Sequence, residues 1–484
     1  MTTKLADIDG EVATIRDCKD WNGEDDPDNA RNWSRTRKVI STAVICLIGF
    51  NTTMGASIYA PGHEDVKREF GVSTTVSLLP LSSYSLGLAF GPMISSPLSE
   101  TFGRKFVYLL TLPLFDIFVL GFGLSQSIGS LIACRFLAGM FAAPGVSVAS
   151  ATIADYIEPE RRAFPLAFYY TIPFIGSAIG PLIGGFAVAE RGWRWTAWII
   201  LIISAVFHPP ALYLRESYKT IILQRLAKRL GVEGPSGPQR TVAETFKEFM
   251  RTTILRPLHM LLTEPLVGFI CLYTGFQFAL LYTFVVASPW VFQHYYGFST
   301  SAQGLTFLGL IVGCLVAPCV LIAVDKFLYQ PRLRRLRGGP ELGAQYQKLP
   351  PEDRLFTALY GSLVLPVALF WFAWSAGRTH WLSPVVAQGV AMLGSILIYV
   401  PCNFFMLDVY GSKYGASSAG ASSLSRYTLS AAFPLFVTQM YEKLGVGWAT
   451  SLLGFVALGM APIPWIFYWM GPRLRARSGY EHGT

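Results

Sequence analysis

Charged residues are scarce in this sequence. Asp, Glu, Lys and Arg together make up 14% of its 484 residues, whereas a soluble domain carries about 25%. Hydrophobic residues make up 52%, and the mean hydropathy is +0.42. A soluble protein of this composition would expose large apolar patches. The composition therefore excludes an ordinary soluble domain and indicates a protein of the lipid bilayer.

Cysteine and histidine are also few, with seven and six residues respectively. Because no C-x-x-C pair or Cys/His cluster occurs, the sequence predicts no metal site, no disulfide framework and no cofactor. The scattered histidines offer no clustered catalytic set, which argues against an enzyme. The phosphate-binding string G-x-x-x-x-G-K-[S/T] is missing, so ATP-driven transport would need another chain.

Long apolar runs dominate what is present. A helix needs about 20 mostly apolar residues to cross a hydrocarbon core of about 30 Å. Twelve such runs are expected, at 37–59, 76–98, 106–125, 129–151, 164–187, 195–214, 265–290, 303–324, 355–375, 381–407, 416–438 and 447–470. The predicted fold class is an all-α integral membrane protein with twelve transmembrane helices.

The net charge of +9 would suit a protein that binds nucleic acid, but the distribution of the Lys and Arg residues along the chain favours a membrane protein. Most Lys and Arg residues lie in the predicted loops that share one side with the N-terminus. Since cytoplasmic loops are the ones enriched in Lys and Arg, both termini are expected in the cytoplasm. The basic run Arg332, Arg334, Arg335 and Arg337 is expected to face anionic lipids of the inner leaflet rather than RNA.

The spans fall into two groups of six. The expected segments are a cytoplasmic tail at 1–36, a first bundle at 37–214, a connector at 215–264, a second bundle at 265–470 and a cytoplasmic tail at 471–484. An amphipathic stretch in the connector, Tyr218–Leu230, is expected to lie on the inner membrane surface. Internal repetition is faint, since Gly309, Gly313, Asp325 and Lys326 only loosely echo Gly87, Gly91, Glu100 and Lys105.

A charged turn is predicted between spans two and three, where an apolar run ends in Glu100, Gly103, Arg104 and Lys105. Gly103 supplies backbone freedom for the turn, and Glu100 can pair with a cation or a helix end of the opposing bundle. We expect this turn to act as a gate, with Asp155 at the end of span four shaping it. The alternative is an ordinary charged loop.

Small residues recur along span five. Gly176, Gly180 and Gly184 are four residues apart, so they share one helix face on which another helix can approach closely. Pro181 removes a backbone donor and kinks the span, and Gly185 follows. The alternative to a functional role is generic close packing.

Few ionisable residues fall inside the predicted spans. Arg135 and Arg426 are the two cations there, and a cation at mid-membrane costs at least about 2.5–3.5 kcal/mol, which makes each a functional candidate. The alternative for each is a structural hydrogen bond between helices. Asp408 is a conceivable partner of Arg426. Asp116 in span three is a candidate for proton carriage, and equally for anchoring its own bundle.

Several of these strings resemble signatures of the major facilitator superfamily. Gly91–Lys105 resembles its loop between spans two and three, Gly176–Gly185 resembles the fifth-span motif of its antiporters, and Arg135–Gly139 resembles its span-four arginine motif, which is implicated in proton coupling. The resemblance implies two pseudo-symmetric six-helix bundles.

The resemblance extends to the fungal twelve-span drug:proton antiporters. It is carried by strings at 26–34, 97–100, 192–195, 433–436, 444–449 and 462–465. That family exports drugs, polyamines or secondary metabolites. Its frequent Pro-Glu-Thr-Tyr string after span six is replaced here by Arg215–Tyr218, which is a modest departure. The Pro-Glu-Ser-Pro-Arg string of sugar porters is missing, which weakens a sugar-uptake interpretation.

The resemblance also places the substrate path along spans 1, 4, 7 and 10. Polar and aromatic candidates for binding substrate are Asn51, Tyr84, Tyr169, Tyr170, Tyr273, Gln277, Tyr282, Gln388, Asn403 and Arg426. Pockets for amphipathic molecules are mostly apolar with few placed polar groups. The alternative is that these residues sit at the membrane interface or join helices.

The expected function is proton-coupled efflux of amphipathic small molecules. Proton-coupled uptake of a nutrient or metabolite is the alternative, and a membrane enzyme or receptor is a more distant one. The expected partners are a small-molecule substrate, protons and the bilayer, without nucleic acid. The chain is expected to act as a monomer in the plasma membrane, with the vacuolar membrane as the alternative.

Overall fold

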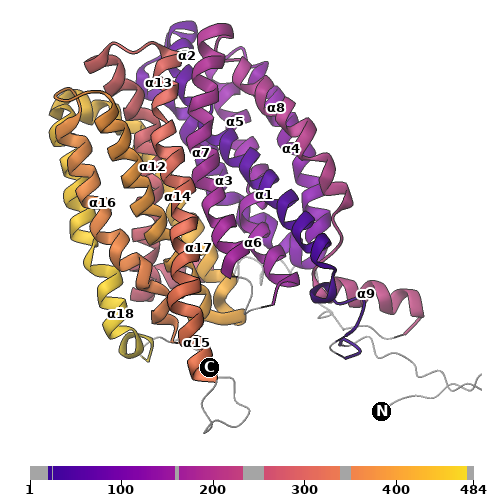
Figure 1. Ribbon diagram of the computed structural model, residues 1–484. Coiled ribbons are helices and arrows are strands. Elements are labelled where there is room, and N and C mark those ends of the chain that lie inside the picture. Colours follow the sequence, from indigo (N-terminus) through magenta and orange to yellow (C-terminus); the bar gives the residue numbers. More distant parts are fainter. Residues whose placement is uncertain (1–19, 24, 159–162, 233–254, 338–349, 477–484) are drawn as a thin grey trace, which may run out of the picture.

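The computed structural model describes residues 20–23, 25–158, 163–232, 255–337 and 350–476. Within these ranges the chain is built from helices and contains no strand. The long helices run side by side along one axis (Figure 1). The short helices α2 (His63–Phe70) and α13 (Thr300–Thr306) mark one end of the molecule, and α9 (Lys219–Leu230) marks the other.

The first half runs from the N-terminal side to α8. Its long helices are α1 (Arg35–Ser57), α3 (Thr74–Thr101), α4 (Arg104–Gly123), α5 (Ile128–Ala142) continued by α6 (Pro144–Tyr156), α7 (Ala163–Arg191) and α8 (Trp195–Phe207). Three short 3₁₀ turns flank them: η1 (Ala30–Asn32), η2 (Ala60–Gly62) and η3 (Pro209–Tyr213). The predicted amphipathic stretch of the connector is the helix α9.

The second half follows α11 (Arg256–Thr263). Its elements are α12 (Pro265–Tyr296), α13 with α14 (Leu308–Val324), the π turn η5 (Asp325–Tyr329), α15 (Gln330–Arg337), η6 (Pro351–Leu355), α16 (Phe356–Ser375), α17 (Leu382–Met460) and α18 (Pro462–Arg475). Helix α15 carries the predicted basic run, whose side chains from residue 334 onward lie outside the described part.

Helix α17 consists of three helical segments. Its backbone leaves the helical region at Gly411 (φ 55°) and at Gly445 (φ 70°). These left-handed values favour glycine because a side chain would be strained there. The segments 382–410, 412–444 and 446–460 therefore change direction at two glycines.

Ten described stretches are long and apolar enough to cross a membrane. The prediction of twelve spans differs from this number for two reasons. Helix α3 has the length, at 28 residues, but its many serines and prolines lower its hydropathy. The last stretch, Ser417–Arg475, has 59 residues and contains the break at Gly445, so it is long enough for two spans. With these two adjustments the helices correspond one to one to the predicted spans.

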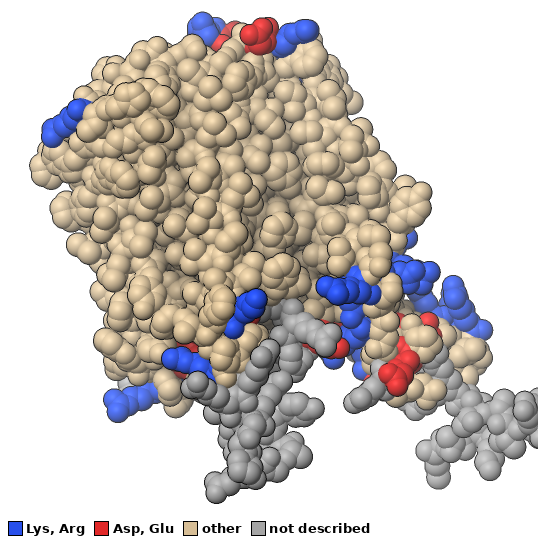
Figure 2. Space-filling model, viewed as in Figure 1, with Lys and Arg blue, Asp and Glu red and all other residues tan. Residues whose placement is uncertain are grey.

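Surface charge agrees with this arrangement. Figure 2 shows a broad uncharged zone on the visible face, with Lys, Arg, Asp and Glu gathered towards the two ends. More of the Lys and Arg residues lie at the α9 end than at the α2 end. An apolar belt between charged ends is what a bilayer requires.

Glycine pairs in the two halves make equivalent helix contacts. A Cβ added to Gly87 of α3 would lie 2.2 Å from the carbonyl oxygen of Phe136 in α5. In the second half, a Cβ on Gly309 or Gly313 of α14 would lie 2.1 Å from a carbonyl oxygen of α17, that of Val385 or Gly389. The contact geometry thus shows the repeat that the sequence only faintly suggests.

Charge pairing stays within each half. Every ion pair between two described residues joins partners that both lie in 20–232 or both lie in 255–476. The halves instead meet through ring contacts such as Phe174 with Phe278, whose centroids are 4.5 Å apart. Close backbone packing of Gly185 against Gly304 joins α7 to α13.

Candidate functional site

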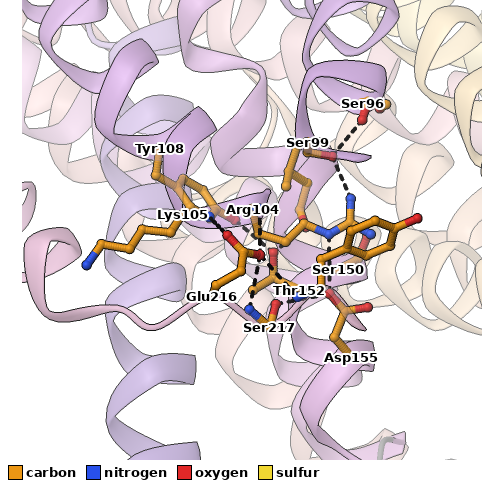
Figure 3. A network of polar contacts seen from close by, with 12 residues as sticks. Ser96, Ser99, Arg104, Lys105, Tyr108, Ser150, Thr152, Asp155, Glu216 and Ser217 are labelled. Atoms are coloured by element: carbon orange, nitrogen blue, oxygen red, sulfur yellow. Dashed lines mark hydrogen bonds and ion pairs between the residues drawn. The ribbon is translucent and has the colours of Figure 1, made fainter. Parts of the chain in front are cut away.

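The turn between α3 and α4 is held by a carboxylate from the start of the connector. Gly103 has φ +102°, and the oxygens of Glu216 occupy the space beside it. Glu216 accepts hydrogen bonds from the backbone N–H groups of Arg104 (2.9 Å) and Lys105 (3.2 Å), as Figure 3 shows. It also accepts from two N–H groups of its own segment. A carboxylate at the first turn of α4 is stabilised by the helix dipole and by unpaired N–H donors.

The side chains of the turn form a second layer of contacts. Arg104 donates from Nε to Asp155 Oδ2 (3.2 Å) and from a terminal nitrogen to Ser99 Oγ (2.5 Å). Lys105 donates to the carbonyl oxygen of Leu212 (2.8 Å). Glu100 is exposed and forms no ion pair or hydrogen bond with another described residue. The contact expected between Glu100 and the opposing bundle is therefore not seen, and Glu216 binds the helix end from within the same half.

An equivalent ion pair stands in the second half. Arg354, just before α16, donates to Asp408 Oδ2 at 2.9 Å and lies 4.0 Å from Asp325. Arg104 and Asp155 hold the corresponding places, at the start of span three and the end of span four. Asp408 was a conceivable partner of Arg426, but its carboxylate instead accepts from Arg354.

Arg135 is completely buried in α5, inside the first half. Its guanidinium donates to the carbonyl oxygens of Gly55 (2.7 Å), Ala56 (2.9 Å) and Pro80 (3.3 Å). The ring of Tyr84 stacks on it at 4.5 Å. No described carboxylate pairs with it, so its charge is compensated by backbone dipoles and aromatic faces. Arg135 thus ties α1, α3 and α5 together.

Asp116, whose side chain is 31% exposed, belongs to a chain of polar groups in the first half whose other members, His208 and Asn51, are buried. Its Oδ2 lies 3.0 Å from Nδ1 of His208, at the end of α8. The other ring nitrogen, Nε2, lies 3.2 Å from the amide nitrogen of Asn51 in α1, and that amide also donates to Ser204 Oγ (2.8 Å). The second oxygen of Asp116 and the amide oxygen of Asn51 are buried and have no hydrogen-bond partner. Three helices therefore meet at one acid and one imidazole.

The glycine face of α7 packs on α1. A Cβ at Gly176 would lie 2.2 Å from Thr53 Oγ1, one at Gly180 would lie 2.1 Å from Ser57 Oγ, and one at Gly184 would lie 2.3 Å from the carbonyl oxygen of Ile58. Gly185 points elsewhere, since its Cβ would lie 3.1 Å from the carbonyl oxygen of Thr300 in α13. Pro181 packs beside this second contact, because its carbonyl oxygen is 3.5 Å from a Cβ built on Gly304. The motif thus contacts both halves.

Arg426 lies in an aromatic cluster where the halves meet. The guanidinium is within 4.7–5.4 Å of the ring centroids of Tyr427, Phe278 and Tyr399. Across the interface, Phe174 of α7 is 5.1 Å from Tyr399, and Tyr170 is 6.3 Å from it. We call these six residues the Arg426 cluster.

Comparison with known proteins decides the family. Residues 45–434 match the Major Facilitator Superfamily. The chain belongs to this superfamily. Polyamine transporter 4 of Saccharomyces cerevisiae is 36% identical over 98% of this chain and 75% of its own length. The MFS-type transporter traF of Penicillium crustosum is 35% identical, covering 95% of this chain and 93% of its own. The ascochitine biosynthesis cluster MFS transporter of Didymella fabae is also 35% identical, covering 95% and 89%.

Solved structures agree on the fold. The proton:xylose symporter XylE superposes with a TM-score of 0.64 at 15% identity, covering 90% of this chain and 97% of its own. At this identity the likeness shows the all-α superfamily fold alone. The family match and the relatives show that this chain is a multi-pass membrane transporter, not an enzyme, and that it acts on small molecules.

A cleft of about 440 Å³ opens between the halves of this superfamily member. One wall is Phe164 and Ala167 of α7, and the opposite wall includes Pro401 and Phe404 of α17. Phe404 also contacts Tyr170, at 5.7 Å between ring centroids. The cleft therefore reaches the Arg426 cluster through an aromatic contact.

The predicted substrate residues separate into groups. Tyr170, Arg426 and Asn403 lie together, because Asn403 donates to the carbonyl oxygen of Tyr399 (2.8 Å). Tyr273 and Gln277 lie buried along α12, where Gln277 donates to the carbonyl oxygen of Tyr273 (3.2 Å).

The remaining candidates join helices. Asn51 and Tyr84 belong to the Asp116 and Arg135 networks, and Tyr169 donates to the carbonyl oxygen of Val146 (2.6 Å). Gln388 bridges Ser288 Oγ and the carbonyl oxygen of Thr306, and Tyr282 lies buried in α12.

Sequence reasoning missed His208, Glu216 and Tyr399. A lone histidine in an apolar run gives no signal beyond its presence in a predicted span. Glu216 was visible only in the string that departs from the family's pattern.

Proposed function

We propose that this transporter exports amphipathic small molecules by proton antiport with alternating access. The observation that carries the proposal is the Asp116–His208–Asn51 chain, in which a partly exposed acid contacts a buried imidazole inside the membrane zone, apart from the cleft between the halves. The names of the relatives, which include secondary-metabolite cluster transporters, support export of such molecules.

The substrate path is proposed to run from the cleft to the Arg426 cluster. The Arg426 cluster is made of aromatic side chains around one cation, and the cleft combines apolar and aromatic side chains with the polar groups of Asp325, Lys326, Gln330, Asp353 and Arg354. Pockets for amphipathic molecules likewise join an apolar lining to a few placed polar groups. Tyr170, Asn403 and Arg426 are proposed to touch substrate there, with Tyr273 and Gln277 further along α12.

The proton is proposed to bind at Asp116 and His208. Without it, the neutral imidazole donates from Nδ1 to the carboxylate and accepts from Asn51 at Nε2. With it, Nε2 becomes a donor, so the amide of Asn51 must turn its unpaired oxygen towards the ring. Asn51 is part of α1, and α1 packs on the glycine face of α7. Helix α7 in turn contacts the second half through Gly185. Protonation therefore changes a hydrogen bond of α1 that is connected to the second half through α7.

Arg135 is proposed to support coupling by fixing α1 relative to α3 and α5, rather than by facing the substrate. Glu100, Gly103, Arg104, Lys105 and Asp155 are proposed to form a gate at the α9 end, where the turn biases one arrangement of the halves. We propose the plasma membrane as the location and a single chain as the working unit.

Proton coupling of this kind supplies enough free energy for useful export. One proton moving through about 100 mV provides about 2.3 kcal/mol, and one pH unit adds about 1.36 kcal/mol. The total of about 3.7 kcal/mol maintains a gradient of a few hundred-fold for a neutral substrate.

Proteoliposomes test the proposal. With the purified chain and the amphipathic anionic dye 8-anilinonaphthalene-1-sulfonate as probe, an acidic lumen should drive dye accumulation and the dye should raise lumenal pH. Asp116→Asn and His208→Gln should each reduce this accumulation strongly but measurably, while dye exchange without a gradient persists. His294→Gln, at the exposed end of α12, is the matched control. Accumulation driven by an alkaline lumen would instead indicate symport and overturn the proposal.

A further inference from the structure

The two arginines inside the membrane zone are satisfied to different degrees. Every nitrogen of the Arg135 guanidinium donates to a backbone carbonyl oxygen. Arg426 donates to the hydroxyl groups of Tyr399 and Ser423 only, and its Nε is buried without a hydrogen-bond partner. The Arg426 side chain is nevertheless buried, with 6% of the residue exposed. Each guanidinium nitrogen of Arg135 therefore has an acceptor, whereas the Nε–H group of Arg426 has none among the described residues.

No described carboxylate neutralises Arg426. Three acids within or at the ends of the spans pair with other groups: Asp116 with His208, Asp155 with Arg104, and Asp408 with Arg354. A buried cation without a counter-charge is costly, and the neutral rings around it lower that cost only in part. A bound anion would supply the missing charge and the missing acceptor.

The surroundings of Arg426 define the rest of such a ligand. Phe278, Tyr399 and Tyr427 present ring faces or edges around the guanidinium, and Tyr170 and Phe174 close the cluster from the first half. Rings of this kind make favourable stacked or edge contacts with a flat apolar body. A planar guanidinium matches the two oxygens of a carboxylate.

We propose that Arg426 binds the carboxylate of an aromatic or polycyclic organic acid, so that the substrates of this transporter are amphipathic anions. The inference rests on the proposed function, because it assigns the chemical class of the exported molecule. It separates this chain from a relative whose name says polyamine, since a polycation beside Arg426 would meet like charge and no free carboxylate.

Equilibrium binding to the purified full-length chain in detergent tests the inference without any proton gradient. The probes are 2-naphthoate, its neutral methyl ester and the polycation spermidine, measured by isothermal titration calorimetry. Naphthoate should bind at least about ten-fold more tightly than the ester, and spermidine should not compete with it. Arg426→Ala should remove the preference, while Arg426→Lys should retain part of it because the charge remains and the planar fork is lost.

The controls keep the outcome decisive. Arg378→Ala removes an exposed arginine that stacks on Trp374, and it should leave the preference unchanged. Should Arg426→Ala elute as aggregate, Arg426→Lys and the probe series on the wild-type chain still decide the question. Equal affinity for naphthoate and its ester, no saturable naphthoate binding at about 1 mM, or spermidine as the tightest ligand would each overturn the inference. Proton antiport of spermidine would overturn the anion inference while supporting the proposed function. Naphthoate binding without proton antiport would support the anion inference and overturn the proposed function.

Discussion

Replacing Gly180 should separate α7 from α1 and stop transport. A Cβ at this position would lie 2.1 Å from Ser57 Oγ, 2.8 Å from the backbone nitrogen of Ile58 and 2.9 Å from the carbonyl oxygen of Met54. The hydroxyl of Ser57 can rotate away, but the two backbone atoms cannot. Since ordinary contacts begin at 3.4 Å, even alanine requires α1 to retreat by about 0.6 Å, the difference between 3.4 and 2.8 Å.

The free-energy cost follows from this geometry. Overpacking in a close-packed interior costs about 1–3 kcal/mol, and the better helix propensity of alanine returns up to about 1 kcal/mol. Gly180→Ala should therefore be tolerated with reduced stability. Gly180→Leu adds three more carbon atoms against the same backbone, so it should exceed the upper end of that range and displace α1 together with Asn51.

Gly459→Leu is the matched control, because that helical glycine is exposed and a Cβ there meets nothing within 4 Å. Membrane abundance, thermal stability by fluorescence-detected size exclusion, and dye accumulation driven by an acidic lumen should be compared. We expect Gly180→Leu to insert but to melt earlier and to lose gradient-driven transport, with Gly459→Leu near wild type. Equal stability and transport in the two variants would refute the close-contact argument.

Three further changes test the polar networks. Glu216→Gln weakens the hydrogen bonds to the first turn of α4, each worth about 1.5–3 kcal/mol with a charged partner, so the melting temperature should fall. Glu100→Gln, at an exposed site, is the control and should leave the melting temperature unchanged. Equal melting temperatures in the two variants would contradict the role given to Glu216. Arg135→Lys keeps the charge, but lysine cannot reach three carbonyl oxygens in one plane. This variant should have a lower melting temperature and transport less. A wild-type melting curve would show that the planar guanidinium group is dispensable. Asp116→Asn with His208→Gln should lose no more gradient-driven transport than either change alone, because residues that act as a pair are not additive; additive losses would show two independent roles.

The helices were predictable because hydropathy and glycine spacing are local properties of the chain. The four-residue spacing of Gly176, Gly180 and Gly184 predicts a shared face, and the structure places that face against α1. The fold class followed from the same signals. Only the number of membrane-capable stretches differed from twelve, because serines and prolines lower the hydropathy of α3 and because the last stretch joins two spans across the break at Gly445.

Polar pairing was much less predictable, because it depends on how helices are rotated relative to one another. Asp408 and Arg426 are close in sequence, yet Asp408 binds Arg354 across 54 residues. His208 meets Asp116 across 92 residues. No periodicity in a single sequence encodes such a meeting.

The confinement of ion pairs to one half or the other has a mechanical consequence. When the two bundles rock, no charge pair between described residues has to be pulled apart and solvated again, so the desolvation cost that makes buried ion pairs rigid does not enter the barrier. Each bundle keeps its own ion pairs as it moves. The surface between the bundles is made mainly of aromatic rings and close backbone packing, with the hydrogen bond between Gln439 and Thr75 as a polar contact across it. Contacts of this kind depend little on salt concentration and strongly on the shapes of the side chains. Substitutions of small or aromatic residues at this surface should therefore alter the rate of turnover more than changes of surface charge.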